Sequence, residues 1–260
     1  MTHYPLHITD STGTTIEIKK QPERIVSLVP SITYTLHRLE LDKEVVGITR
    51  FCKFPENWKK TKKIIGGTKD IKIGRIAALK PDIILANKEE NTKEAVEELR
   101  KIAPVYVSEV SDMKSNKRFI NDLAEIFDKK NTGKQINDKI DKKLQKLAGH
   151  KPLKSLYFIW REPWMSVGGD TFISQMMQYA GFENLLKNEK RYPTVKIEEL
   201  QKLHPEIILL CSEPFPFKEN HQAEMQVYFP DAEVMIVEGE AFTWFGAYAE
   251  KAFEYFKQLR

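Results

Sequence analysis

Aromatic and arginine side chains gather in a few short segments of the chain, each just after an apolar run of strand length. Aromatic rings bind flat, partly apolar ligands through contacts worth about 0.5–1.5 kcal/mol each beyond the area they bury. Arginine guanidinium groups hold carboxylate or phosphate groups in fixed geometry. The sequence therefore predicts ligand binding by these segments. The candidate ligand-binding residues are Ser31, Arg50, Phe51, Phe54, Trp160, Arg161, Trp164, Phe215, Phe217, Trp244 and Phe245.

Each of these residues also has a simpler interpretation. A loop aromatic can fold inward as part of a satellite core, and an exposed arginine can form an ordinary surface salt bridge. The aromatics taken together favour a binding surface, because large exposed apolar patches usually mark interaction sites. Ser31 is included because it opens a predicted helix over 31–40, whose free N–H groups can face a ligand.

The motifs of common enzymes are absent from the sequence. It contains no phosphate-binding glycine loop, no dinucleotide-binding fingerprint and no nucleophile elbow. The histidines lack the spacing of metal ligands, and Cys52 and Cys211 lie in different halves of the chain. We therefore expect no catalytic residue, no bound metal and no cofactor.

A repeated phrase indicates which elements position the candidate residues. "LKPDIILAN" (79–87) recurs as "LHPEIILLC" (203–211), at an offset of 203 − 79 = 124 residues. In each copy an amphipathic helix is stopped by proline, which lacks the N–H that a helix needs. The apolar run that follows is typical of a parallel strand buried on both faces. Ligands of such sheets bind outside the carboxyl ends of the strands.

The neighbouring segments extend each copy into an α/β unit. Strands are predicted at "RIVSLV", "EVVGIT" and "PVYVSEV" in the first half, and at "SLYFIW" and "AEVMIVEG" in the second, with a hairpin before the first unit turning at 11–13. Ile136, Ile140, Leu144 and Leu147 lie on one face of a connecting helix that we expect to begin near Thr132 and to end at Gly149. The prediction is an α/β protein of two three-layer lobes, residues 1–130 and 151–260, joined by a backbone helix over 131–150, with the ligand cleft between the lobes.

Composition limits the partners. The chain has 260 residues and a net charge of +4, and its basic excess is concentrated between Met113 and Lys154. That segment is nearly free of aromatics, so a solvated helix face is expected rather than a nucleic-acid site. With a mean hydropathy of −0.46 and no apolar run of membrane-spanning length, we expect no membrane insertion and a monomer.

The first residues do not resemble a signal peptide, which favours the cytoplasm; the alternative is a periplasmic protein whose signal has been removed.

Four segments carry a resemblance to a known family: "RIVSLVPSITYTL", "VVGITRFCKFP", "GGTKDIKIGRIAALKPDIILAN" and "VGGDTFISQMMQYAGFENLL". They resemble the substrate-binding proteins of ABC importers of the cobalamin and siderophore type, which have a helical backbone. "PSIT" and "RFCKFP" are most similar to the cobalamin-binding branch. The resemblance implies binding of a corrinoid or another metal chelate without chemistry, and an ABC permease as partner.

Members of this family dock on their permease through a glutamate at the tip of each lobe. The resemblance places Gly74 and Gly246 at those positions, so docking is in doubt. The alternatives are a ferric-siderophore or haem-binding protein, a cytoplasmic corrinoid sensor or carrier that does not dock, and an enzyme acting on a metallated substrate.

Overall fold

The computed structural model describes residues 2–147 and 151–259, and the chain divides into two compact units. Unit 1 contains the chain up to Lys139 together with the short segment Phe245–Tyr248. Unit 2 contains Ile140–Trp244 and the chain from Ala249 onward. Each unit has its own five-stranded sheet, so the predicted α/β class with two lobes is confirmed.

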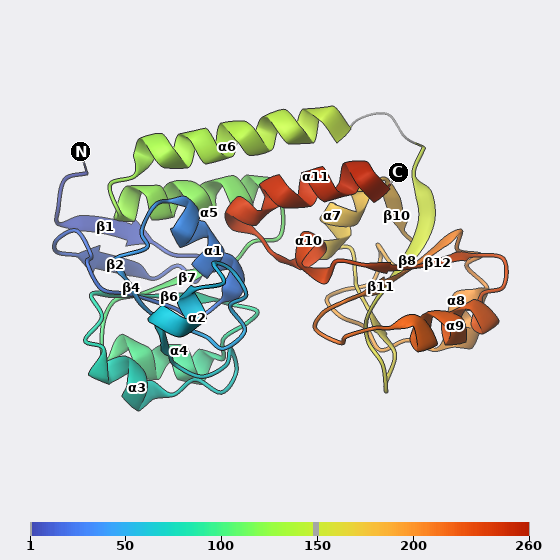
Figure 1. Ribbon diagram of the computed structural model, residues 1–260, viewed down its shortest axis with the longest axis horizontal. Coiled ribbons are helices and arrows are strands. Elements are labelled where there is room, and N and C mark those ends of the chain that lie inside the picture. The colour runs from blue at the N-terminus through green and yellow to red at the C-terminus, as the bar shows by residue number, and fades with distance from the viewer. Residues whose placement is uncertain (1, 148–150, 260) are drawn as a thin grey trace. The chain divides into compact units, whose positions relative to one another are not determined.

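The sheet of unit 1 is parallel throughout, in the order β5-β4-β3-β6-β7. Because parallel crossovers are right-handed, connections that run in opposite directions place their helices on opposite faces. Figure 1 shows α1 and α5 on one side of this sheet and α3 and α4 on the other. The strands are β3 (Ile25–Ser27), β4 (Val45–Ile48), β5 (Lys63–Ile64), β6 (Ile83–Asn87) and β7 (Val105–Ser108), and the helices are α1 (Pro30–Arg38), α2 (Trp58–Thr61), α3 (Ile73–Ala78), α4 (Lys93–Arg100) and α5 (Met113–Ile126).

The sheet of unit 2 has the order β10-β8-β11-β12, and β9 pairs antiparallel with β8. Helices α7, α10 and α11 lie on one side of it, and α8 and α9 lie on the other (Figure 1). The strands are β8 (Leu153–Trp160), β9 (Met165–Ser166), β10 (Phe182–Asn184), β11 (Ile207–Cys211) and β12 (Glu233–Val237), and the helices are α7 (Phe172–Tyr179), α8 (Ile197–Gln201), α9 (Glu219–Tyr228), α10 (Gly239–Thr243) and α11 (Ala249–Leu259).

The repeated phrase forms the equivalent strand in each unit. Every residue of β6 and of β11 is buried, and each strand has a parallel neighbour on either side. The helices before them, α3 and α8, end ahead of Pro81 and Pro205, as predicted. The predicted hairpin is also present, as β1 (Leu6–Thr9) paired with β2 (Thr15–Ile18).

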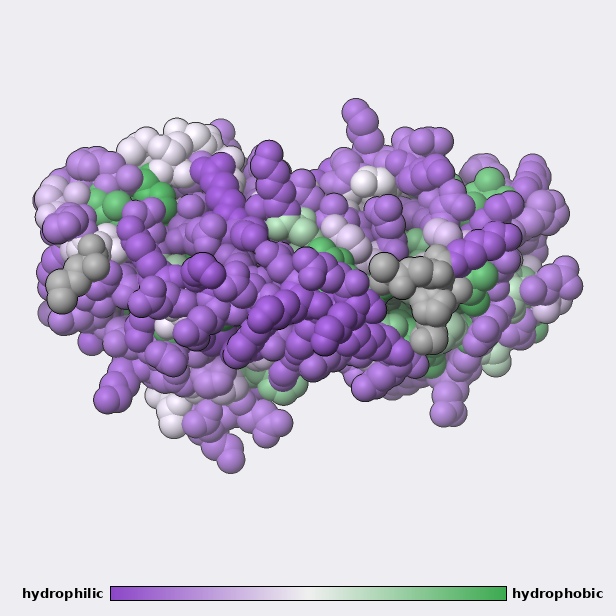
Figure 2. All heavy atoms as spheres, turned by 90° about the horizontal axis from the view of Figure 1, so that it is seen from above, coloured by the Kyte–Doolittle hydropathy of each residue, from purple (hydrophilic) through white to green (hydrophobic). Residues whose placement is uncertain are grey.

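The connecting helix α6 spans Lys130–Leu144 and continues as a 3-10 turn over Gln145–Leu147. It begins two residues before the expected Thr132, and the expected end at Gly149 lies outside the described residues. Gly133 lets α6 approach α5, because a Cβ there would overlap the Ala124 side chain. The outward face of α6 is hydrophilic (Figure 2), as the lysine-rich composition predicted.

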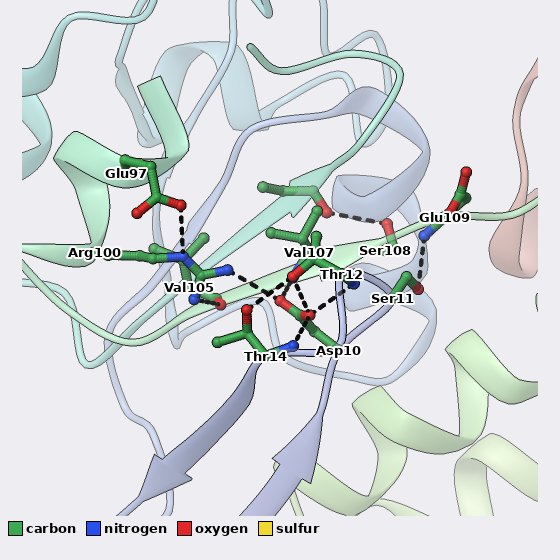
Figure 3. A network of polar contacts seen from close by, with 11 residues as sticks. Asp10, Ser11, Thr12, Thr14, Glu97, Arg100, Val105, Val107, Ser108 and Glu109 are labelled. Carbon is green, nitrogen blue, oxygen red and sulfur yellow. Dashed lines mark hydrogen bonds and ion pairs between the residues drawn. The ribbon is translucent and has the colours of Figure 1, made fainter. Parts of the chain in front are cut away.

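The hairpin closes the open edge of the unit 1 sheet at β7 (Figure 3). Asp10 is buried at the turn, where its Oδ1 accepts from Thr12 N at 2.8 Å and from Thr14 N at 3.1 Å. Its Oδ2 accepts from the edge-strand Val107 N and from Arg100 Nη2, both at 3.2 Å. The Asp10 carboxylate therefore stabilises the turn and forms an ion pair with Arg100. It also accepts a hydrogen bond from Val107 N, an edge-strand donor that could otherwise pair with a strand of another chain.

The segment Phe245–Tyr248 packs within unit 1 although its neighbours in sequence belong to unit 2. Gly246 N donates to Asn116 Oδ1 at 2.5 Å, and Asn116 Nδ2 donates back to Gly246 O at 3.3 Å. Ala247 N donates to Thr35 Oγ1 at 3.1 Å. Gly246 is therefore buried, and the prediction that it stands at an exposed docking tip is wrong.

We expect Asp10→Ala to lower the free energy of unfolding by about 3–5 kcal/mol, the usual cost of leaving one partner of a buried ion pair alone. Glu97→Ala is the matched control, because Glu97 contacts the same Arg100 at 3.6 Å from a largely exposed position. Its removal should cost no more than about 1 kcal/mol. Urea unfolding measures both, and equal losses would contradict the role assigned to Asp10.

Gly246→Ala should also be strongly destabilising. Its φ of +77° costs alanine about 1–2 kcal/mol, and overlap of the new Cβ with Thr35 Oγ1 adds about 1–3 kcal/mol. Gly74→Ala is the control, since Gly74 is an exposed helical residue with open space at its Cβ. It should gain about 0.5–1 kcal/mol, and similar effects at both glycines in urea unfolding would refute this account.

Candidate ligand-binding site

The carboxyl edge of each sheet carries the loops in which the candidate residues lie. The candidates follow β3 and β4 of the unit 1 sheet and β8, β11 and β12 of the unit 2 sheet, or end the strand itself in the case of Trp160. In unit 1 the connections from β3 and from β6 leave in opposite directions, which makes a topological switch point between these adjacent strands. Such a point is where open α/β sheets leave space for a ligand.

Arg50 and Phe51 form a stacked pair after β4. The Arg50 guanidinium lies 5.0 Å from the centre of the Phe51 ring. Asp70 holds the same guanidinium from the other side, through Nη1–Oδ2 at 3.1 Å and Nη2–Oδ1 at 2.9 Å. Phe51 is 49% exposed, so its ring is presented to solvent while Arg50 is already paired.

The pKa of Asp70 records this pairing. Desolvation acts to raise it, but the hydrogen bond and the charge of Arg50, together with the Gly67 N–H at 3.0 Å, outweigh that effect and lower the pKa. Asp70 therefore stays ionised and keeps its hold on Arg50 at neutral pH. Asp70 lies 20 residues beyond its partner Arg50, so the pairing is not visible in any local sequence pattern.

The other candidates of unit 1 lie deeper. Ser31 is buried in the first turn of α1, whose N-cap is Val29. Phe245 is buried with its ring edge-on to Phe119 at 5.2 Å, so the expectation of an exposed aromatic is wrong for Phe245. Phe54 is half-buried. A ligand-binding role for these three stays a prediction.

The loop after β6 is ordered by amide side chains that sequence reasoning missed. Asn87 Oδ1 accepts from Glu89 N at 3.0 Å, and Asn91 Nδ2 donates to Thr68 O at 2.9 Å. Beside them, burial raises the pKa of Glu90. The only signal available in the sequence was the position of these residues directly after a buried strand.

In unit 2 the structure brings several predicted aromatics into one cluster, here called the aromatic cluster. Trp160 and Phe215 have ring centres 5.6 Å apart, and Phe215 and Phe217 are 4.7 Å apart. Phe217 lies parallel to Trp164, with 3° between the ring planes and 6.2 Å between the centres. The members are Trp160, Trp164, Phe215, Phe217 and His221, of which Trp160 is the most open, at 41% exposed.

Arg161 closes one end of the aromatic cluster. Its guanidinium lies 5.6 Å from the centre of the Trp164 ring. Glu224 accepts from Nε at 3.1 Å and from Nη2 at 3.0 Å, a bidentate pair, and Glu162 accepts from Nη1 at 2.5 Å. The hydrogen bonds that Arg161 donates to Glu224 raise the pKa of Arg161, so the cation is permanent. For both arginines the salt-bridge alternative is thus what the structure shows.

Two predicted rim residues of unit 2 are buried instead. Trp244 is only 5% exposed, because its Nε1 donates to Glu213 Oε1 at 2.8 Å and draws the indole inward. Phe217 is 4% exposed and forms the floor of the aromatic cluster. The expectation of an exposed rim was wrong for both side chains.

His221 also belongs to the aromatic cluster, although no sequence pattern indicated it. Its ring lies edge-on to Phe215 at 5.3 Å, and its Nδ1 accepts from Lys218 N at 3.0 Å. In the neutral ring an accepting Nδ1 leaves the proton on Nε2. Placed in this way, His221 is a hydrogen-bond donor toward the surface and not a metal ligand.

A shallow groove of about 380 Å³ lies elsewhere on unit 1. It is lined by Thr14–Glu17 of the hairpin and by the segment 100–105 that leads into β7. It therefore lies toward the amino end of β7, away from the candidate loops. Within residues 2–147 and 151–259, no three His, Cys, Asp or Glu side chains are grouped as metal ligands would be.

Comparison with known families identifies the class of protein. Residues 25–227 match the periplasmic binding protein family, and the chain belongs to that family. Its members are substrate-binding proteins of transport systems and not enzymes, which confirms both the predicted resemblance and the expected lack of catalysis. In the described part of the chain, no helix combines the length and the apolarity that a membrane span needs.

Individual proteins with similar sequences or folds can be compared with this chain one by one. The uncharacterized ABC transporter substrate-binding lipoprotein YvrC of Bacillus subtilis is 27% identical, over 79% of this chain and 69% of the relative. A vitamin B12-binding protein of Vibrio campbellii is 24% identical, over 72% of this chain and 70% of the relative. A periplasmic haem-binding protein of Pseudomonas aeruginosa superimposes with a TM-score of 0.81 at 15% identity, covering 92% of each chain, which shows a shared fold alone.

The burial difference between two tryptophans predicts different effects on stability. Trp244→Ala should lower the free energy of unfolding by about 3–5 kcal/mol, as for other large buried aromatics. Trp160→Ala should cost about 1 kcal/mol or less, since much of the ring already faces water. Urea unfolding checks both, and a large loss at Trp160 with none at Trp244 would contradict the assignment of rim and core.

Proposed function

We propose that this protein binds cobalamin or a related corrinoid without chemistry, as the substrate-binding component of an ABC importer. The observation that carries the proposal is the aromatic cluster, which presents Trp160 and Phe215 at the carboxyl edge of the unit 2 sheet. A large, flat, partly apolar ligand is the chemistry that such a surface favours. The similarity to a vitamin B12-binding protein supports the same choice.

Haem or a ferric siderophore is the second candidate, favoured by the fold shared with a haem-binding protein. Haem iron takes an axial ligand from the protein, commonly His, Tyr, Cys or Met. In the aromatic cluster, His221 has its Nδ1 lone pair occupied by Lys218 N–H, so it does not fill that role as placed. A corrinoid that brings its own axial ligands makes no such demand, and this difference favours the corrinoid.

The proposed partner is an ABC permease, with a docking acid in unit 2. Because Gly246 is buried, the position equivalent to Gly74 is better taken from the internal repeat, where 74 + 124 gives residue 198. Residue 198 is Glu198, an exposed side chain in the first turn of α8. We infer docking through Glu198 in unit 2, with Gly74 leaving the corresponding position of unit 1 uncharged.

The names of the relatives also bear on location. The expectation of a cytoplasmic protein rested on the first residues alone, whereas the relatives are named as a lipoprotein and as periplasmic proteins. We therefore propose the alternative stated at the outset, that the protein works outside the cytoplasmic membrane and meets its permease there.

Titration with cyanocobalamin, cobinamide, haem and a ferric siderophore tests the proposed function. Tryptophan emission and calorimetry should both report submicromolar binding of a corrinoid. Trp160→Ala should weaken it by about 1–3 kcal/mol, the range of a contact residue that matters, with little change in the thermal midpoint. Val227→Ala is the control, an exposed apolar residue on α9 outside the aromatic cluster. Binding of haem or siderophore alone would refute the corrinoid assignment, and no binding at all would refute the function.

The docking proposal is tested with a cobalamin importer reconstituted in liposomes. Glu198→Gln should reduce association with the importer, because a close acid–arginine pair across an interface couples by about 1.5–7 kcal/mol. Gly74→Glu should increase association, since the exposed site accepts a side chain without overlap. Unchanged association in both variants would exclude these positions as docking points.

A further inference from the structure

Both arginines selected from the sequence share an arrangement in which one carboxylate and one ring hold the guanidinium. In unit 1, Asp70 contacts two nitrogens of Arg50, and Phe51 lies 5.0 Å from the same group. In unit 2, Glu224 contacts two nitrogens of Arg161, whose guanidinium lies 5.6 Å from the Trp164 ring. Each arginine comes directly or almost directly after a strand of its sheet.

In unit 2 a series of ring contacts, one stacked, one tilted and one edge-on, connects this arrangement to the exposed surface. Trp164 stacks in parallel on Phe217, Phe217 contacts Phe215, and Phe215 contacts the exposed Trp160. Fixing Arg161 therefore fixes the base on which the outer rings rest. Preorganised rings lose less side-chain entropy when a ligand binds, so this support contributes directly to affinity.

The carboxylate partners also determine whether the two arginines are free to pair with a carboxylate group of a ligand. A ligand carboxylate would have to displace Glu224 from a bidentate geometry, which is among the strongest hydrogen-bonded pairs in proteins. Asp70 occupies Arg50 in the same way and is also held by Gly67 N–H. With its guanidinium group paired, each arginine supports a flat, apolar ring surface of its own unit, and Glu162 gives Arg161 a second carboxylate partner.

Resting on the corrinoid function proposed above, we propose that Arg50 and Arg161 are positioning residues that support rings, not cations that hold ligand carboxylates. Each of these two ring surfaces then selects a flat ligand with an uncharged, amide-bearing rim over the same kind of ligand with a carboxylate rim. Glu224 and Asp70 are the residues that set this selectivity.

A first experiment needs no ligand. Quenching of tryptophan emission is measured with iodide, an anion, and with acrylamide, a neutral quencher. Glu224→Gln removes one of the two carboxylates that pair with Arg161 beside Trp164, so the local potential becomes more positive and the iodide quenching constant should rise about twofold. The acrylamide constant should stay unchanged. Glu219→Gln, the same charge change on the same helix, should move neither.

A second experiment uses two corrins that differ at the rim: cobinamide, with amides, and cobyrinic acid, with carboxylates. Wild type should bind cobinamide at least about tenfold more tightly, and Glu224→Gln should reduce that ratio about threefold or more, because it opens the Nε and Nη2 side of Arg161 to the acid while Glu162 keeps only Nη1. Glu219→Gln should leave the ratio unchanged. A merely structural role for Glu224 would weaken both ligands equally and leave the ratio alone.

The outcomes separate the two proposals. If neither corrin binds wild type, the proposed function fails, and the iodide-to-acrylamide comparison still decides the role of Arg161. If cobinamide binds but cobyrinic acid binds as tightly, or if Glu224→Gln moves neither readout, the positioning role is refuted. Should Glu224→Gln fold poorly, Arg161→Lys serves instead: it keeps the charge but loses the bidentate pair, so iodide quenching should stay unchanged while cobinamide binds more weakly, and unchanged cobinamide binding would refute the positioning role. In unit 1, Asp70→Asn with Phe51→Trp as reporter repeats the quenching test.

Discussion

The burial of both faces of the two central strands is the constraint on which the structure depends. In β6 and β11 every residue is buried, and the side chains before the last residue of each strand are all apolar. Polar and charged groups must then gather in the loops at the strand ends, and the connections of a parallel sheet bring those loops together at the carboxyl edge. This explains why the candidate binding residues lie at the carboxyl ends of strands or in the segments that follow them.

The loops themselves are fixed by ion pairing as well as by the burial of aromatic residues such as Phe217 and Trp244. Asp70 and Glu224 each take up an arginine, and each arginine in turn supports an aromatic ring. Exposed ion pairs of this kind contribute little to stability. Their contribution is geometric, since they keep a flat ring at a surface from which a free side chain would turn inward. Trp244 illustrates the alternative, because its indole N–H is bound by Glu213 and the ring is lost to the core.

Sequence patterns predicted the elements well and the side-chain positions less well. The repeat at 79–87 and 203–211 identified both central strands, since an apolar run after proline has few other folds open to it. Glu224 was missed because it lies 63 residues from Arg161, and no local pattern reports contacts at that separation. Gly246 was misplaced because its left-handed backbone and its contact with Asn116 arise only when the chain returns to unit 1. The sequence patterns did not predict which residues of distant loops pair with each other.

The central claim is that the ligand binds at the carboxyl edges and not elsewhere on the protein. Hydrogen–deuterium exchange, measured by mass spectrometry with and without cyanocobalamin, tests it directly. The account predicts slower exchange on binding in the segments around 160–164 and 212–221, where the aromatic cluster lies. Protection confined to the groove formed by 14–17 and 100–105, with none in those loops, would contradict it.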